Sequence, residues 1–432
     1  MWNSILLASN AKGRLAFLKR VRRIVERYGM RPDRMDKALK QFTGILGQYD
    51  CGATFPITAV TLQRSPHLIT KYLSKNLEFA VHGYTHINYA QLAPEIQLAH
   101  LKHALKVFTE VGIPVTGFRS PYLSRNDHLY ASVEAAGFSY ISNQPMIWDA
   151  LKIDTLSPSA AAGFERAMSF YNPWLASERS SLPFQESRLV EIPITLPDDE
   201  ILIDRLDGGN DLVKDAWLRI LSLTYQRGEL FTLQLHPERI AMCADGLSAV
   251  LARARSLKPG VWCTRLDEIA TWWKTRAEAR LEISGDFDCG FFCDLNGPYG
   301  LTVLARGIET DAPSLAWENG YREVKTTHFA FKSSLRPLIG LSPSSSTYMV
   351  QFFNRHGYFI ETSLEPERYA FYFDQATFDA NQEQSILNQI EGSAQPLLRL
   401  GLWPNGNKSA LAITGDIDAL TLWDYGLRII GM

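Results

Sequence analysis

Short apolar runs alternate with amphipathic stretches from residue 14 to residue 274, and this alternation restricts the fold more than any other feature. Residues 53–60, 77–81 and 230–235 are apolar runs of strand length, whereas residues 95–111 have a helical pattern. Strands that alternate with helices are typical of parallel α/β folds. We therefore expect an α/β protein in which catalytic groups follow the strands.

A second region, residues 281–395, has a different pattern. Its aromatic and β-branched runs are separated by Gly, Pro, Ser and Asn turns, which predicts a small all-β, sandwich-like domain. The runs are residues 300–305, 326–331, 348–353 and 368–373. A polar helical stretch and a turn then lead to residues 409–414, an apolar run like those of the first region.

Polar residues follow four of the apolar runs. They are His82 with His86, Arg119, His236, and the pair Asp416 and Asp418. Groups that each end a different parallel strand can form one active site. If the chain turns into a helix after residue 81, the two imidazoles of His82 and His86 project to one side and supply two of the three protein ligands of a catalytic zinc site. Two histidines at this spacing also occur by chance on a polar face.

Together these motifs resemble the polysaccharide deacetylases of the NodB-homology type, which are similar to carbohydrate esterase family 4. That family has an aspartate pair, HxxxH, RxPY, a segment with tryptophan, and Leu-His. Here the motifs read Asp416-Ile-Asp418, His82-Gly-Tyr-Thr-His86, Arg119-Ser-Pro-Tyr122, a segment near Trp148-Asp149, and Leu235-His236. Asn143 stands where the family usually has an aspartate. The resemblance implies a distorted (β/α)7 barrel.

The resemblance also implies a metal-dependent hydrolase that removes an acetyl group from an N-acetylated saccharide. Asp418, His82 and His86 would bind a divalent metal, for which Zn²⁺ is the first expectation and other divalent transition metals are alternatives. Such a metal lowers the pKa of its water and polarises the acetyl carbonyl.

Further roles follow from the same resemblance. Asp416 would be the general base, Arg119 would orient its carboxylate, and His236 would protonate the leaving amine. The backbone N–H of Tyr122 would stabilise the oxyanion. The residues expected to contact substrate are Tyr84, Trp148 and Asp149.

The order of the motifs is unusual, because in the resembling family the aspartate pair precedes HxxxH. Either Asp416 opens a second, truncated domain, or the chain is circularly permuted and its last strand completes the barrel. We favour permutation, with the barrel formed by residues 1–275 and 403–432 and the all-β accessory domain by residues 281–395. Residues 411–414 should then pair beside residues 53–58, residues 420–430 should form a helix, and Met432 should lie near the N-terminal helix.

A second Gly-Asp-x-Asp sequence at Asp286 and Asp288 is an alternative source of the carboxylates. It is followed by β-type runs, whereas Asp418 is followed by a helical pattern, so we favour Asp416 and Asp418. We interpret the acidic run at residues 197–200 as a solvated loop.

Two other functions fit the same motifs. The barrel could hydrolyse non-sugar linear or cyclic amide C–N bonds, or an inert protein could bind carbohydrate through exposed aromatic residues.

Composition bears on partners and location. Lys+Arg 44 against Asp+Glu 46 leaves a net charge of −2, which lacks the basic footprint of nucleic-acid binding. No apolar run approaches the roughly 20 residues of a membrane-spanning helix, and at the start of the chain basic residues follow the apolar ones, the reverse of a secretory signal. Five cysteines without paired spacing fit a reducing compartment. We expect a cytoplasmic protein without a membrane partner.

Overall fold

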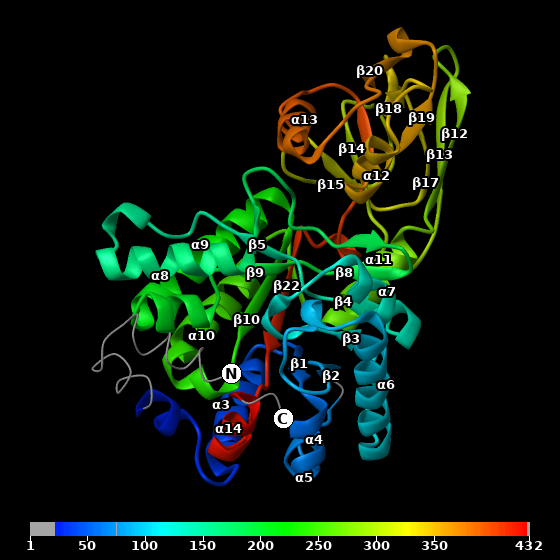
Figure 1. Ribbon diagram of the computed structural model, residues 1–432. Helices are drawn as coiled ribbons and strands as arrows, with labels where there is room; N and C mark the ends of the chain where they lie inside the picture. The colour runs from blue at the N-terminus through cyan, green and yellow to red at the C-terminus, as the bar shows by residue number, and fades with distance from the viewer. Residues whose placement is uncertain (1–21, 75, 430–432) are drawn as a thin grey trace.

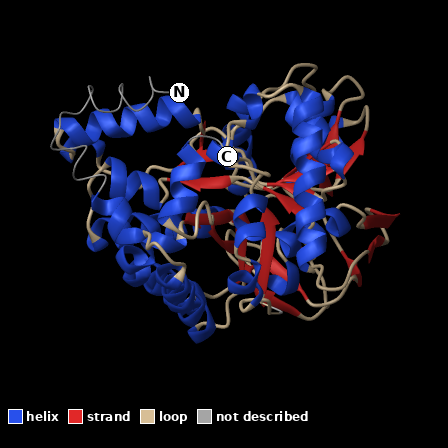
Figure 2. Cartoon of the chain, turned by 60° about the horizontal axis from the view of Figure 1, so that its bottom comes forward, coloured by secondary structure: helices blue, strands red, loops and turns tan. Residues whose placement is uncertain are grey.

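A sheet of mostly parallel strands curls through the centre of the larger part of the molecule and is surrounded by helices (Figures 1 and 2). The computed structural model describes residues 22–74 and 76–429. The strands of this sheet are β1 (Ala53–Ile57), β2 (Leu77–Val81), β3 (Gly117–Phe118), β4 (Tyr140–Ile141), β5 (Pro145–Ile147), β6 (Trp174–Leu175), β7 (Phe184–Glu186), β8 (Leu189–Glu191), β9 (Ile194–Leu196), β10 (Leu230–Leu235), β11 (Val261–Thr264) and β22 (Ser409–Gly415).

The pairings close this sheet into a barrel. β4 runs on into β5, and β8 into β9; β4 pairs with β8, β5 with β9, and β9 with β10. Because β10 pairs with β22 and β22 with β1, the order β22, β1, β2, β3, β4/β5, β8/β9, β10 returns to β22. The predicted distorted (β/α)7 barrel is confirmed.

Helices cover the outside of the barrel. They are α3 (Asp33–Gln48), α4 (Ala59–Arg64), α5 (Pro66–Thr70), α6 (Pro94–Val111), α7 (Asp127–Ala136), α8 (Pro158–Tyr171), α9 (Asn210–Arg227), α10 (Ile240–Ser256), α11 (Leu266–Arg276) and α14 (Leu422–Ile429). In α6 the buried residues Leu101, Ala104 and Phe108 share one face, and Gly112 ends the helix with a φ of 79°. The strands have apolar residues on both faces, since every residue of β1 and β10 is buried.

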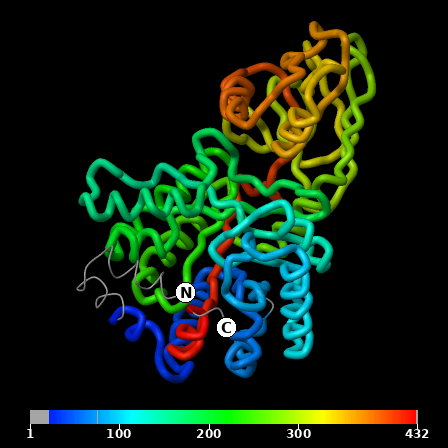
Figure 3. Tube along the Cα trace, viewed as in Figure 1, coloured from blue at the N-terminus to red at the C-terminus, as the bar shows by residue number. Residues whose placement is uncertain are grey.

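The last strand completes the barrel, as predicted, but of residues 411–414 only Thr414 pairs with the strand at residues 53–57. β22 lies parallel to β10 over six residue pairs, and it lies parallel to β1 through Thr54 opposite Thr414 and a bridge between Ile57 and Ile417. Its first four residues pair with β11, which we did not predict. The trace in Figure 3 follows this C-terminal segment down beside the N-terminal strands. The expected helix is α14, and Met432 lies outside the described residues.

Residues 280–400 form three smaller sheets (Figure 1, top). One contains β12 (Arg280–Asp286), β13 (Gly290–Asn296) and β17 (His328–Phe331); the second β15 (Ser314–Ala316), β16 (Arg322–Val324), β14 (Val303–Arg306) and β21 (Leu397–Leu400); the third β19 (Ile360–Thr362), β18 (Arg336–Leu341) and β20 (Tyr369–Phe373). These strands bear out a mainly β region. The division of the chain at residues 275, 281, 395 and 403 stays a prediction.

The all-β description needs a correction, because the unexpected helix α12 (Thr347–Arg355) packs in this region, together with α13 (Glu383–Glu391), which is the predicted polar helical stretch. The run at residues 348–353, which we expected to be a strand, lies within α12. Ser346 caps that helix by accepting a hydrogen bond from the Met349 N–H, and the buried Met349, Phe352 and Phe353 have helical spacing. Burial of one helical face thus outweighed the β propensity of the aromatic residues.

Candidate active site

The carboxyl ends of β2 and β22 bring His82, His86 and Asp418 together. Oδ1 of Asp418 lies 3.3 Å from Nε2 of His82 and 3.3 Å from Nε2 of His86. All three side chains are buried, and each offers one ligand atom. These three atoms lie within 4.8 Å of one another. Among the described residues this is the group whose atoms could hold a metal ion.

HxxxH lies in a bend rather than in the helix that we considered. Gly83 has a φ of 82°, and a Cβ there would come within 2.7 Å of the Tyr89 ring. Glycine is therefore required at this turn. The turn brings the rings of His82 and His86 to a centroid distance of 5.2 Å.

The hydrogen bonds of His82 select its tautomer. Its Nδ1 lies 2.9 Å from the backbone carbonyl oxygen of Arg119. A carbonyl only accepts, so Nδ1 carries the proton and the Nε2 lone pair is directed toward Asp418. This second contact is the usual way in which a protein orients a metal-binding imidazole.

The protonation states of the other two residues also suit a cation. Burial, followed by the positive charge of Arg428, lowers the pKa of His86 to about 4, so its imidazole is neutral at neutral pH. Burial opposes ionisation of Asp418, but the positive charge of Arg428 holds its pKa well below the usual range. Oδ1 of Asp418 is buried without a hydrogen-bond donor. The neutral His86 imidazole, the Nε2 lone pair of His82 and this oxygen fit a divalent metal such as zinc.

Asp416 lies beside this group, with both carboxylate oxygens held. Arg119 Nη1 donates to Oδ1 at 2.7 Å, and Gln234 Nε2 donates to Oδ2 at 2.8 Å. Arg119 also donates to the Thr414 hydroxyl at 2.8 Å and to the Ser142 hydroxyl at 3.0 Å, which keeps the guanidinium in place. We did not single out Gln234, although a glutamine within an otherwise apolar strand was a usable signal.

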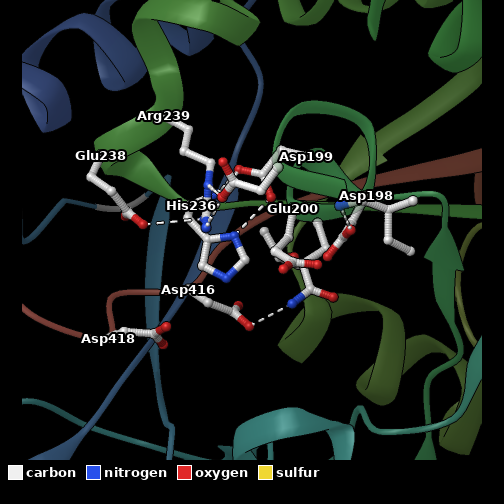
Figure 4. Close-up of polar contacts among 12 residues, drawn as sticks. Asp198, Asp199, Glu200, His236, Glu238, Arg239, Asp416 and Asp418 are labelled. Carbon is white, nitrogen blue, oxygen red and sulfur yellow. Dashed lines mark hydrogen bonds and ion pairs between the residues drawn. The ribbon is translucent and has the colours of Figure 1, made fainter. Parts of the chain in front are cut away.

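His236 follows β10 and is held by Asp199, a residue that our prediction placed in a solvated loop. That prediction is wrong, because Asp198 and Asp199 are buried. Oδ1 of Asp199 lies 2.7 Å from Nδ1 of His236, and Oδ2 accepts a hydrogen bond from the His236 backbone N–H at 2.7 Å. Figure 4 shows the His236 ring with Asp199 on one side and Asp416 on the other. The signal was a carboxylate soon after the apolar strand β9, which we noted but interpreted as part of a solvated loop.

Asp199 gives His236 the protonation state of a general acid. Burial by itself lowers the pKa of His236, but the Asp199 carboxylate outweighs burial and raises that pKa to about 10. The imidazolium form therefore persists at neutral pH. A protonated imidazole beside a reacting group can deliver a proton to a leaving nitrogen.

We expect Asp199→Asn to move the alkaline limb of the pH–rate profile from near pH 10 to below pH 7. Without the carboxylate, burial and Arg239 both lower the pKa of His236, so the acid form is lost at neutral pH. Turnover at pH 8 should fall about 100-fold. Asp286→Asn is the control, since it removes a carboxylate from the exposed turn after β12, away from His236. Equal profiles for wild type and Asp199→Asn would contradict this role.

Other predicted site residues lie in different surroundings. Tyr122 has a φ of 61°, and its ring packs on His86 with centroids 4.6 Å apart. Tyr84 packs against His103 on α6, Trp148 is buried under the Arg227 guanidinium, and the Asp149 side chain is 86% exposed beside Arg219. Within the described part of the chain, none of these last three residues has a side-chain bond or ring contact with His82, His86, His236 or Asp416. Their role as substrate contacts stays a prediction.

The alternative aspartates have a local structural role. Asp286 Oδ1 accepts hydrogen bonds from the backbone N–H groups of Asp288 and Cys289, at 3.0 and 2.7 Å, in the exposed turn between β12 and β13. Both belong to the β region rather than to the strand ends that carry the histidines.

One family model and several solved structures are similar to part of this chain. Residues 29–141 match the family model for polysaccharide deacetylase. Similar solved structures include a protein of Mycobacterium smegmatis described as a polysaccharide deacetylase (20% identity, 54% of this chain and 76% of that chain, TM-score 0.42) and the PuuE allantoinase (19%, 55% and 72%, TM-score 0.42). Another is a family 4 carbohydrate esterase pseudoenzyme of Bacillus anthracis (17%, 43% and 57%, TM-score 0.25). No curated protein matches the chain.

Proposed function

We propose that this chain, which carries a polysaccharide deacetylase sequence over residues 29–141, is a metal-dependent hydrolase that removes an acetyl group from an N-acetylated saccharide. The observation that carries the proposal is the meeting of His82, His86 and Asp418 beside Asp416 and His236. This group contains a cation site, a candidate base and a candidate acid, which are the parts that amide hydrolysis needs.

His82, His86 and Asp418 would hold the metal. When bound there, a divalent metal such as Zn²⁺ supplies Lewis-acid polarisation of the acetyl carbonyl and a water of lowered pKa. Asp418 would offer Oδ1, the oxygen that lies between the two imidazoles. The two histidines would each offer Nε2.

The remaining residues divide the proton transfers between them. Asp416 would take a proton from the attacking water, and Arg119 and Gln234 keep its carboxylate in one orientation. His236, which the Asp199 carboxylate keeps protonated, would give a proton to the leaving nitrogen. The backbone N–H of Tyr122 would donate to the developing oxyanion, and Tyr84, Trp148 and Asp149 would contact the saccharide.

Two further proposals concern the whole chain. We infer that the order of its strands arose by circular permutation of the deacetylase barrel, which accounts for the place of β22 between β10 and β1. We also infer a cytoplasmic location from the cysteine usage. None of the helices within residues 22–74 and 76–429 combines the length and the apolar character that crossing a bilayer requires.

The test is acetate release from N-acetylated oligosaccharides by the zinc-loaded protein. We expect Asp418→Asn to weaken zinc binding more than about 100-fold and to abolish acetate release, since even residues that only orient metal ligands are worth 10–100-fold. Asp286→Asn is the matched control and should behave as wild type, because it removes a carboxylate of the same sequence pattern from a surface turn.

Different failures have different meanings. The zinc-loaded wild type could be found to release no acetate from N-acetylated saccharides and to hydrolyse linear or cyclic amides. That result would show that the substrate is a non-sugar amide. Protein that binds no zinc and hydrolyses neither class, yet retains carbohydrates, would establish the inert binding function instead.

A further inference from the structure

Arg428, near the end of α14, reaches into the predicted metal site. Its Nη2 lies 2.8 Å from Oδ2 of Asp418 and 3.1 Å from Nε2 of His86. Arg428 is separated from His86 by 342 positions and belongs to none of the sequence motifs. The contact places a permanent positive charge among three groups that suit a divalent cation.

The contact with His86 uses an atom that a metal also needs. A guanidinium has only N–H donors, so the bond at 3.1 Å is donated by Arg428 to the lone pair on Nε2 of His86. That lone pair cannot serve an arginine proton and a metal at the same time. A divalent metal bound to His86 and the Arg428 guanidinium would also repel each other in this buried site, because both are positively charged.

Helix α14 is anchored at its first turn, away from Arg428. The Leu422 N–H donates to the Gly29 carbonyl oxygen at 2.9 Å, and the Tyr425 ring lies 5.2 Å from the ring of the buried Tyr28. Arg64 Nη1, at the end of α4, donates to Oδ1 of Asp424 at 3.3 Å. These contacts set the direction of the helix without involving its last turn.

The Arg428 side chain has a way out of the site. It is 21% exposed, whereas its partner Asp418 is 4% exposed. Its guanidinium carbon lies 5.8 Å from the centre of the Tyr425 ring, a distance typical of a cation–π contact. A long side chain with one end at the surface can therefore leave the histidines by rotation about its own bonds while the helix stays docked.

We propose that Arg428 gates the metal site: its guanidinium and the divalent metal compete for His86 and Asp418, and metal enters when the side chain swings outward. The inference rests on the proposed function, because it needs the metal site formed by His82, His86 and Asp418. It adds a residue that regulates occupancy of that site. The reaction itself requires no part for Arg428.

The test measures zinc affinity, by competition with a chromophoric chelator, for the full chain and its variants. If the side chain points outward in about 1–10% of molecules, Arg428→Gln should bind zinc roughly 10–100-fold more tightly, since removal of the competing state restores the intrinsic affinity. Arg428→Lys, which keeps the charge, should lie near wild type. Arg255→Gln removes an exposed arginine that bonds to the Tyr49 carbonyl oxygen, and should not change the affinity.

Measurements on the unaltered chain and on a ligand variant separate the two proposals. Zinc should bind wild type and bind His86→Ala far more weakly; equal binding by the two would overturn the metal site itself. If that difference holds but Arg428→Gln binds zinc as wild type does, or more weakly, the gate alone is wrong and Arg428 instead steadies Asp418.

Discussion

Deletion of residues 409–432 is expected to abolish both cooperative folding and metal binding. β22 is buried along its whole length and lies between β10 and β1, so its loss opens the barrel on both sides. Burial of Leu411, Ile413 and Ile417 contributes about 5–9 kcal/mol at 1.5–3 kcal/mol each, which is comparable with the about 5–15 kcal/mol by which a typical domain is stable. The same deletion removes Asp416 and Asp418.

Thermal unfolding by circular dichroism, size-exclusion chromatography and zinc stoichiometry would measure this effect. The control is a chain that ends at Thr421, which keeps β22 and both aspartates and should still fold cooperatively. The deletion of residues 409–432 could instead leave a soluble protein that unfolds cooperatively and binds zinc. This result would show that β22 is dispensable and that the metal-binding carboxylate comes from elsewhere.

Asp416→Asn and His236→Ala should each lower turnover by about 10²–10⁴ while zinc remains bound. Positioned acid and base groups are generally worth that much, and neither residue belongs to the group whose ligand atoms meet within 4.8 Å. Single-turnover acetate release and zinc content would be measured on the same preparations. His328→Ala is the control, because His328 lies on β17 and pairs with Asp294 in the β region.

Each outcome for these variants has a distinct meaning. Turnover equal to wild type in either variant would remove that residue from the mechanism. Zinc loss in Asp416→Asn would show that the ligand and base roles of Asp416 and Asp418 are reversed.

Agreement between sequence and structure is close wherever a signal is local. Residues 77–81 and 230–235 are strands with the predicted bounds, because mainly apolar runs of strand length are typical of a parallel sheet that is covered on both faces. The run at residues 348–353 carried two signals at once. Its aromatic composition favoured a strand, but its apolar spacing and the serine cap favoured a helix, and packing against the neighbouring sheets decided between them.

The candidate site was predicted to the extent that each residue directly follows an apolar run. HxxxH, Arg119, His236 and the aspartate pair all carry this signal, and the structure places them near one another. Asp199 carries it as well, but an acidic run is most often a solvated surface feature, and only burial against His236 distinguishes it from one.

The sequence by itself determined the α/β pattern, the strand that delivers each polar residue, and the spacing of HxxxH. Only the tertiary structure decided that β11 pairs with the start of β22, that Asp199 holds the His236 imidazole in its protonated form, and that Arg428 reaches Asp418. The physical reason is that secondary structure follows from the periodicity of neighbouring residues. Ionic contacts depend instead on which distant strand ends meet. They also depend on burial, which strengthens the electrostatic interaction between a carboxylate and its partner.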